Sequence, residues 1–141
     1  MFVKQISVFA ENRNGAVMEI TGALLAANVN MRALSIADTI DFGVVRLIAD
    51  KPDAAIEALR REKLTVVETD VIAISVDDRP GGFHAALKAL YEGEIMIEYS
   101  YAFVAPVGGG ATVILKCREP ERAVRMLGEN GVKMLTQEEI S

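Results

Sequence analysis

An internal repeat constrains the fold of this chain more than any other feature of its sequence. When the sequence is shifted by 66 residues, residues 8–15 (VFAENRNG) fall on residues 74–81 (ISVDDRPG). Beyond residue 43 the shift becomes 68 residues, and residues 45–59 then fall on residues 113–127. A two-residue change in the shift is expected in a loop, because loops tolerate insertions better than strands or helices do. Each half of the chain is therefore predicted to be one copy of the same structural unit.

Within each copy the apolar residues alternate between the period of a strand and that of a helix. In the first copy we expect strands at 5–10, 30–38, 43–49 and 64–67, with helices at 15–27 and from Pro52 onward. In the second copy we expect strands at 71–76, 95–104, 111–117 and 132–136, with helices at 82–92 and 120–129. The order βαββαβ, joined by right-handed crossovers, predicts a ferredoxin-like four-stranded antiparallel sheet with two helices on one face. The predicted class is α+β, with tandem copies at residues 1–68 and 69–141.

This architecture predicts assembly. A sheet with helices on one face leaves its other face and its edge strands uncovered. Because 51% of the residues are apolar, we expect those surfaces to be covered in a homodimer. About three residues, 68–70, separate the last strand of the first copy from the first strand of the second. We therefore expect the two copies to pack closely as one rigid body.

Composition and charge exclude several classes of function. The chain carries 15 basic and 20 acidic residues without a basic cluster, so no nucleic-acid partner is expected. A single cysteine, Cys117, and a single histidine, His84, exclude a disulfide framework and a zinc site, and no cofactor is expected. The longest uncharged stretch is broken by Pro106 and three glycines, and the N-terminus lacks the apolar run of a signal peptide. We therefore expect no membrane partner and a cytoplasmic location.

The turn after the first strand of each copy is the segment best suited to hold a ligand. These turns read Glu-Asn-Arg-Asn-Gly at 11–15 and Asp-Asp-Arg-Pro-Gly-Gly at 77–82. Each leads into a helix N-terminus, whose unpaired N–H groups and dipole favour an anion such as a carboxylate. Asn12 offers a donor and an acceptor, and Asp77 and Asp78 could accept an ammonium group. A turn rich in Gly, Asn and Asp also forms without any ligand, so both interpretations stand at this point.

These residues resemble a known family. A βαββαβ unit opened by Asn-Arg-x-Gly (12–15) or Asp-Arg-Pro-Gly (78–81), with Asn-Val-Asn-Met at 28–31 after the first helix, resembles the ACT domain. The resemblance covers nearly the whole chain as two tandem copies. It implies a small regulatory module of amino-acid metabolism, which pairs with another such module and often binds an amino acid at the interface between the two.

The resemblance also implies site residues. In the serine-binding branch, as in phosphoglycerate dehydrogenase, the ligand contacts include an Asn in the first turn and an Asn that opens the second strand, and Asn12 and Asn30 match these positions. The His of that branch is Ala10 here, and the second copy has Asp78 and Met96 in place of the two asparagines. The implied ligand-binding residues are Asn12, Arg13, Asn14, Gly15, Asn30, Asp78, Arg79 and Gly81.

The function that we predict is a non-catalytic sensor that binds a free amino acid and acts on a metabolic enzyme in trans. The alternative is a regulatory subunit of an amino-acid biosynthetic enzyme, of the acetolactate synthase small-subunit type. An enzyme is disfavoured because the sequence offers no nucleophile–base pair, metal cluster or cofactor loop. His84 is expected on a helix surface, Cys117 in the core, and Gly108–110 in a hairpin turn, since no Lys-Ser/Thr of a phosphate loop follows.

Overall fold

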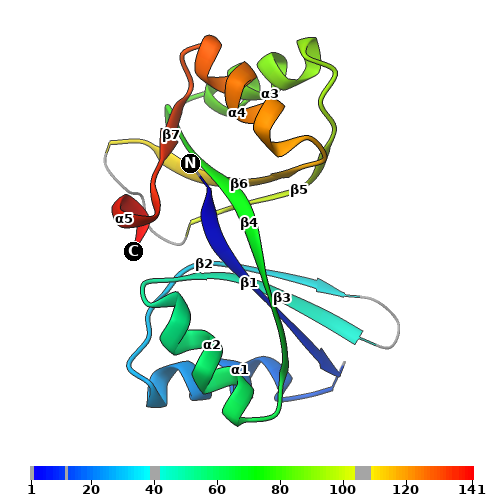
Figure 1. Ribbon diagram of the computed structural model, residues 1–141, viewed down its shortest axis with the longest axis vertical. Helices are drawn as coiled ribbons and strands as arrows, with labels where there is room; N and C mark the ends of the chain where they lie inside the picture. The colour runs from blue at the N-terminus through cyan, green and yellow to red at the C-terminus, as the bar shows by residue number, and fades with distance from the viewer. Residues whose placement is uncertain (1, 12, 39–41, 104–108) are drawn as a thin grey trace. The chain divides into compact units, whose positions relative to one another are not determined.

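The computed structural model describes residues 2–11, 13–38, 42–103 and 109–141 of the chain (Figure 1). The elements in the first half are β1 (Val3–Glu11), α1 (Ala16–Ala26), β2 (Met31–Asp38), β3 (Phe42–Ala49) and α2 (Pro52–Arg61). A long strand, β4 (Thr65–Val76), leads into the second half. The elements that follow are α3 (Gly82–Glu92), β5 (Ile97–Ala102), β6 (Ala111–Cys117), α4 (Pro120–Glu129), β7 (Lys133–Leu135) and α5 (Gln137–Ile140).

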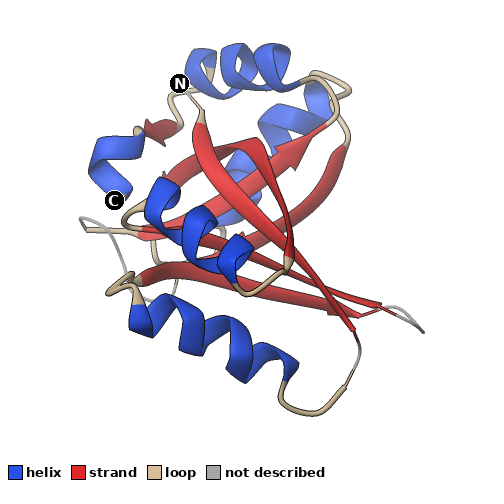
Figure 2. Cartoon of the chain, turned by 60° about the horizontal axis from the view of Figure 1, so that its bottom comes forward, coloured by secondary structure: helices blue, strands red, loops and turns tan. Residues whose placement is uncertain are grey.

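The chain divides into two compact units, which we call the N-terminal unit (Lys4–Thr69) and the C-terminal unit (mainly Asp70–Ile140). In the N-terminal unit the strands lie in the order β2-β3-β1-β4, and β3 is antiparallel to both of its neighbours. In the C-terminal unit the order is β5-β6-β4-β7, with every pair antiparallel. Each sheet carries its two helices on one face (Figure 2). The predicted α+β class and the two ferredoxin-like βαββαβ copies are confirmed.

The two units bury equivalent positions of the repeat. The matched pairs, all at most 1% exposed, are Ile6 and Ile72, Val8 and Ile74, Leu24 and Leu90, Leu47 and Leu115, and Leu59 and Leu127. Burying one such side chain stabilises the fold by about 1.5–3 kcal/mol. The second helix of each unit begins at a proline, Pro52 or Pro120, where the missing N–H group costs nothing. The repeat in the sequence is thus a repeat of core positions and of helix starts.

The structure differs from the sequence prediction along β4. We expected two strands at 64–67 and 71–76 with a connection around Glu68 and Asp70, whereas a single strand runs without a break from Thr65 to Val76. The polar residues suggested a connection, but β-branched residues surround them, and such residues favour an extended backbone. The last strand of the first copy and the first strand of the second copy are therefore one element.

Helix α5 was missed by the sequence analysis. The Thr136 N–H donates to Glu139 Oε1 (3.0 Å), and the Glu139 N–H donates to Thr136 Oγ1 (3.3 Å). This reciprocal pair is a capping box, which satisfies two N–H groups at a helix start. The side chain of Ile140 closes the segment, fully buried. The Thr-x-x-Glu pattern was the signal in the sequence that could have revealed this helix.

The C-terminal unit confirms the predicted burial of Cys117 and also contains a stacked pair of tyrosines. Tyr99 and Tyr101 share one face of β5, opposite Lys116 and Ile114, and their rings stack with centroids 6.5 Å apart. Cys117 is buried in the core. Of the predicted glycine turn, Gly110 lies where the backbone passes close to β4, since a Cβ there would be 2.4 Å from the Val76 carbonyl oxygen. Gly108 and the predicted strand end at residue 104 lie outside the described residues.

Candidate functional site

The turn that joins the first strand to the first helix has the same backbone geometry in both units. Gly15 and Gly81 are the N-cap residues of α1 and α3, with φ of 88° and 86°. This left-handed conformation favours glycine, which has no Cβ. The first N–H of each helix donates back into the turn, from Ala16 to the Arg13 carbonyl oxygen (3.3 Å) and from Gly82 to the Arg79 carbonyl oxygen (3.0 Å). Two of the predicted site residues, Gly15 and Gly81, therefore set the direction in which the helix begins.

The remaining predicted residues of the turns are placed as follows. Arg13 and Asn14 are exposed beside the start of α1, and Asp78 and Arg79 are exposed before α3. Asn12 lies outside the described residues.

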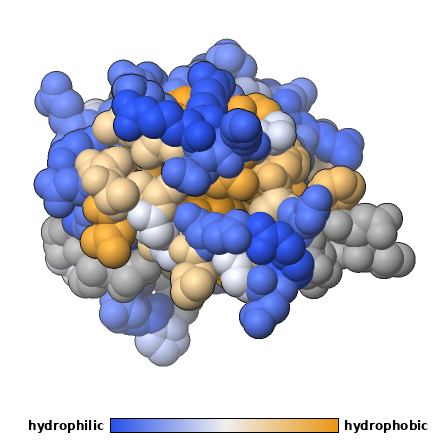
Figure 3. Space-filling view, turned by 90° about the horizontal axis from the view of Figure 1, so that it is seen from below, coloured by the Kyte–Doolittle hydropathy of each residue, from blue (hydrophilic) through white to orange (hydrophobic). Residues whose placement is uncertain are grey.

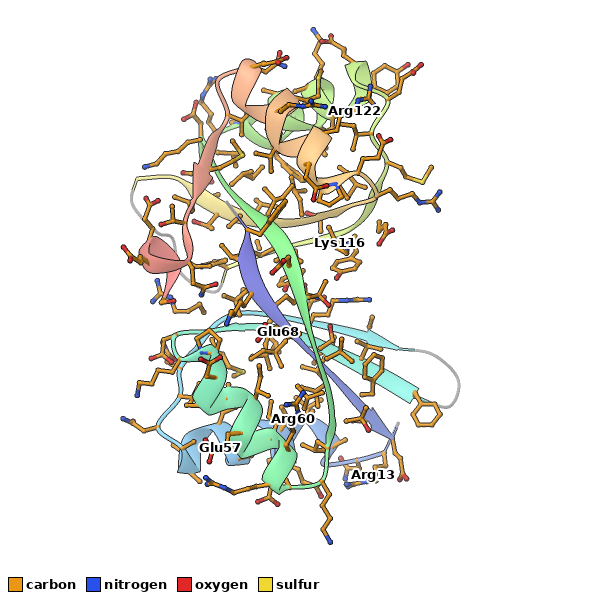
Figure 4. The ribbon with its side chains drawn as sticks, in the orientation of Figure 1. Arg13, Glu57, Arg60, Glu68, Lys116 and Arg122 are labelled. Carbon is orange, nitrogen blue, oxygen red and sulfur yellow. The ribbon has the colours of Figure 1, made fainter. Side chains whose placement is uncertain are left out.

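A cavity of about 310 Å³ adjoins the turn of the N-terminal unit. It is lined by Phe9, Ala10, Glu11, Arg13, Ala16, Glu19, Phe42, Lys63, Leu64 and Thr65. Arg13 lies in the turn before α1 (Figure 4), and its Nη2 donates to Glu19 Oε2 at 2.5 Å. Its Nε lies 3.9 Å from Glu11 Oε2. The hydrogen bond with Glu19 raises the pKa of Arg13, and the same bond lowers the pKa of Glu19. A ligand carboxylate here meets a cation that is already shared by two carboxylates.

The equivalent cavity of the C-terminal unit is larger, about 430 Å³, and has smaller side chains. Ala85, Gly110 and Gly131 line it at the positions that Glu19, Phe42 and Lys63 occupy in the first copy. No acidic residue lies in the first turn of α3, whereas Glu19 lies in that of α1. Asp77, which we considered as an acceptor for an ammonium group, pairs its Oδ2 with Arg79 Nε at 3.2 Å. Both units therefore have a cavity at the equivalent position, but the side chains that line the two cavities differ in size and charge.

Asn30 lies at the opposite end of α1 from the turn. It lines a separate cavity of about 270 Å³ with Asn28, Asp50 and Lys51. The Asn30 N–H donates to Asp50 Oδ1 (2.9 Å), and Lys51 Nζ donates to the Asn28 carbonyl oxygen (2.8 Å). A helix of 11 residues is about 16 Å long. The structure thus separates Asn30 from the turn within one unit, although the resemblance implies that both contact one ligand.

The matching cavity in the C-terminal unit has different chemical character. There Met96 stands at the position of Asn30 and Arg118 at that of Asp50, in a cavity of about 350 Å³. Met96 is exposed, and Arg118 carries the opposite charge to Asp50. This end of the C-terminal unit therefore has a cation where the N-terminal unit has Asp50, and its carboxylates, Glu94 and Glu119, stand at the positions of Asn28 and Lys51.

Asp50 and Glu19 are the site residues that sequence reasoning missed. Both change charge between the copies, to Arg118 and Ala85, and such a change between aligned positions was the signal available in the sequence. Together the two ends of α1 offer complementary chemistry for a zwitterion. The turn supplies Arg13 and the helix N-terminus for a carboxylate, and the opposite end supplies Asp50 and the Asn30 amide for an ammonium group.

Other candidate groups have ordinary structural roles. Burial raises the pKa of the Cys117 thiol to about 11, so it stays protonated at neutral pH. His84 is exposed on the surface of α3, as predicted. Within the described ranges, no cluster of three His, Cys, Asp or Glu residues could hold a metal ion. In the same part of the chain, every helix is too short or too polar to cross a membrane.

Comparison with known proteins gives one family and several similar structures. The family model described as "ACT domain pair" matches residues 1–141. Protein BT0572 from Bacteroides thetaiotaomicron is 34% identical with a TM-score of 0.91, over 99% of this chain and 96% of that one. The regulatory subunit of aspartate kinase from Thermus thermophilus is 15% identical with a TM-score of 0.63, over 91% of this chain and 92% of that one. Its counterpart from Thermus flavus is 15% identical with a TM-score of 0.60, over 90% and 91%. No curated protein matches the sequence significantly.

Proposed function

Because the chain belongs to the ACT domain pair family, we propose that it is a non-catalytic regulatory protein that binds a free amino acid. The ligand lies at an interface between two ACT modules. The observation that carries this proposal is the charge pattern along α1, which has Arg13 and the positive end of the helix dipole at one end and Asp50 at the other. An α-amino acid carries the matching pair of charges within a few ångströms.

The distance between the two ends of α1 explains why one module alone cannot bind the amino acid. A single amino acid cannot reach along a helix of about 16 Å, so one unit cannot present both halves of the site to it. A second module that contributes its Asn30 and Asp50 end completes the site formed by the turn of the first. The ligand then stabilises the assembly in which both halves meet, and it does so by its difference in affinity between the joined and separated states.

The first copy is the better candidate for this site. It alone has both Asn30 and Asp50, which Met96 and Arg118 replace in the second copy. Beside Asp50 an ammonium group would gain a charge-assisted hydrogen bond, and the nearby Lys51 is held by the Asn28 carbonyl oxygen. The cavity of the second copy holds two arginines, Arg118 and Arg122, and one of its carboxylates, Glu119, is already paired with Arg122. The predicted contacts of Asp78, Arg79 and Gly81 therefore do not form an equivalent second site in this proposal. The activity under control belongs to a separate metabolic enzyme, which responds to the assembly state of this protein.

Thermal-shift measurements with each of the twenty amino acids test the proposal. A ligand present at 100 times its dissociation constant adds about 2.7 kcal/mol of stability, which raises the melting temperature measurably. The active amino acid is then compared with its carboxamide, which lacks the carboxylate, and with its N-acetyl derivative, which lacks the ammonium group. We expect both derivatives to lose the shift. The proposal fails if no amino acid shifts the melting temperature, or if both derivatives act as well as the parent compound.

A further inference from the structure

One side of α2 and the neighbouring edge of β4 enclose a groove of about 790 Å³, which we call the α2 groove. Its lining residues are Asp53, Ile56, Glu57, Arg60, Arg61 and Glu68. The first five recur at helical spacing along α2, and Glu68 lies on β4. In Figure 4 the side chain of Arg60 lies between α2 and β4. The α2 groove shares no lining residue with the cavities at the two ends of α1.

Beside this groove, β4 forms an edge of the N-terminal sheet. The strand order there is β2-β3-β1-β4, and β6 and β7 pair with β4 only from Ile72 onward. Over residues 65–71, the described part of the chain therefore places a strand, β1, along one edge of β4 only. The side chains of Thr65, Val67 and Glu68 are exposed, Val67 by 46%. The N–H and C=O groups of an open strand edge are a template for pairing with another extended chain.

The C-terminal unit ends the equivalent edge early. Its fourth strand, β7, has three residues, and Thr136, at the position of Glu68, already belongs to the capping box of α5. On α4, Arg125 and Gly128 occupy the positions of Glu57 and Arg60, so the charge pattern differs as well. A very short edge strand is one of the ways in which proteins prevent unwanted pairing. The edge of the N-terminal unit is longer, and it lies beside a groove.

One end of the α2 groove is acidic. Asp53 stands in the first turn of α2, and Glu68 is close to it, because both carboxylates lie near the same cation. Lys4 Nζ is 3.5 Å from Asp53 Oδ1 and 3.9 Å from Glu68 Oε1. Two carboxylates thus share one ammonium group, and this end keeps an excess of one negative charge.

The other end of the groove is basic. Arg60 and Arg61 stand in the last turn of α2, next to the start of β4. Arg61 pairs with Glu57, whereas no acidic residue among the described ones pairs with Arg60. Ile56, half-buried, lies between the two ends. Figure 3 shows the N-terminal unit from the side of its helices, where charged side chains surround smaller apolar areas. The groove therefore has opposite charges at its two ends and an apolar residue between them.

We propose that this edge binds an extended segment of a partner protein, which adds a strand antiparallel to β4 over residues 65–69. The antiparallel direction is that of the pairs β1–β3 and β4–β6. It places the N-terminal end of the segment beside Asp53 and Glu68, and the C-terminal end beside Arg60. Main-chain hydrogen bonds supply affinity in this mode of recognition, and alternate side chains supply selectivity.

The charges of the groove define the segment that fits. Every second side chain of a strand points to the same face, so three alternate residues of the segment face α2. They are a Lys or Arg toward Asp53, an apolar residue toward Ile56, and a Glu or Asp toward Arg60. The outer two are about 13 Å apart along a strand, and Asp53 and Arg60 are about 10 Å apart along the helix, a difference that the long Arg side chain spans.

The proposed function gives this surface a use. Regulation in trans needs a surface that holds the controlled enzyme, and the α2 groove lies apart from the amino-acid site. This use rests on the proposed function, whereas the binding of an extended segment does not. The segment is therefore tested with the full chain in the absence of any amino acid.

Fluorescence anisotropy with labelled peptides measures this binding. The test peptide, blocked at both ends, is Thr-Lys-Thr-Ile-Thr-Glu-Thr, and its control has the same composition with Lys and Glu exchanged. We expect the test peptide to bind at least about tenfold more tightly, because only its order of charges matches the groove in the antiparallel direction. Equal binding of the two peptides, tighter binding of the control, or no binding of either would overturn the proposed docking.

N-methylated peptides test whether a strand is added. In an antiparallel pair, every second residue directs its N–H and C=O groups toward a given neighbour. One version of the test peptide is methylated at the nitrogens of Lys, Ile and Glu, and the other at the nitrogens of the two inner Thr residues. One version should lose at least about tenfold in affinity, and the other should bind like the parent peptide. The same affinity for both versions would show that no strand is added.

A charge reversal in the protein locates the peptide. Arg60→Glu should weaken binding of the test peptide at least about tenfold, and a peptide with Lys in place of its Glu should restore the affinity. The matched control is Arg125→Glu, which reverses an exposed arginine of α4 and should bind like the wild type. Unchanged binding by Arg60→Glu, or an equal loss in both variants, would overturn the assignment to the α2 groove.

The same variant separates this surface from the amino-acid site. Arg60→Glu should keep the thermal shift produced by the amino acid, because Arg60 lines neither cavity at the ends of α1. If an amino acid shifts the melting temperature but no peptide binds, the docking surface is refuted and the proposed function stands. If the peptide binds as expected but no amino acid shifts the melting temperature, the proposed function fails and the docking surface stands.

Discussion

Gly82 offers a sharp test of how the two copies differ in their turns. A Cβ added at this position would lie 1.9 Å from the Asp77 carbonyl oxygen and 3.0 Å from the Asp77 carbonyl carbon. Because the nearest obstacle is backbone, no side chain can move aside, and the turn itself has to shift by about 1 Å. The equivalent residue of the first copy is Ala16, which is buried without such a conflict. Gly82→Ala should therefore destabilise the protein.

The expected magnitude follows from two opposing effects. Overpacking of this kind costs about 1–3 kcal/mol. Replacing Gly by Ala in a helix returns about 0.5–1 kcal/mol through backbone entropy. Because the obstacle is backbone, the cost of overpacking lies in the upper part of its range, about 2–3 kcal/mol. A net loss of about 1–2.5 kcal/mol remains, equivalent to a fall in melting temperature of about 3–9 °C for a chain of this size.

Gly128→Ala is the matched control, since it changes the same residue type in a helix of the same unit. At Gly128 the added Cβ would lie 3.5 Å from the end of the Met134 side chain, an ordinary contact. This variant should gain up to about 1 kcal/mol. Urea denaturation measures both variants through the transition midpoint at constant slope. The reasoning is refuted if Gly82→Ala is as stable as the wild type, or if Gly128→Ala loses as much as Gly82→Ala does.

Three further predictions concern other parts of the chain. Glu19→Gln should bind the amino-acid ligand more tightly, as measured by calorimetry, because Arg13 then no longer forms an ion pair with Glu19 and is available to the ligand carboxylate. Weaker binding would show instead that Glu19 positions Arg13. The backbone N–H of Thr136, and to a smaller extent its hydroxyl, lower the pKa of Glu139, so the contribution of this capping box is present at neutral pH and is lost as the pH falls through the lowered pKa. Thr136→Ala removes the hydroxyl bond and keeps the N–H, so in an NMR titration it should raise the pKa of Glu139 only part of the way to its ordinary value, and a fall in that pKa would contradict this. Native-state digestion by a glutamate-specific protease should leave the bond after Glu68 intact, since Glu68 lies inside β4; rapid cleavage there would contradict a continuous strand.

Much of the fold could be predicted because the repeat doubles the evidence. Core positions such as Ile6 and Ile72 support each other, and Pro52 and Pro120 mark the same helix start twice. The four-residue helix α5 was not predicted because it is too short to show a hydrophobic period. The continuity of β4 escaped because pairing with neighbouring strands decides it, and local polarity at Glu68 and Asp70 points the other way.

The candidate site was less predictable than the fold. Positive φ at Gly15 and Gly81 follows from a glycine before a helix, and the distance of Asn30 from the turn follows from the helix between them. The two cavities beside the turns could not be predicted from the sequence, because their volumes depend on how side chains such as Glu19 and Phe42 fill the space there. The hydrogen bond from the Asn30 N–H to Asp50 joins residues 20 positions apart, so no local sequence pattern predicts it.

The unbroken strand β4 makes the seam of the duplication an intolerant place for insertions. Val66 belongs to one core, and Ile72, Ile74 and Val76 belong to the other, all at even positions of one strand. Because successive strand residues point to opposite faces, one residue added between Glu68 and Asp70 would break the alternation that now runs from Val66 to Val76. A tandem protein with a loop at this seam could lengthen or shorten it freely, and could exchange one copy for another module. Here the junction is a strand that contributes side chains to both cores, so a change of length at this place alters a strand, whereas a change at a turn alters only a loop.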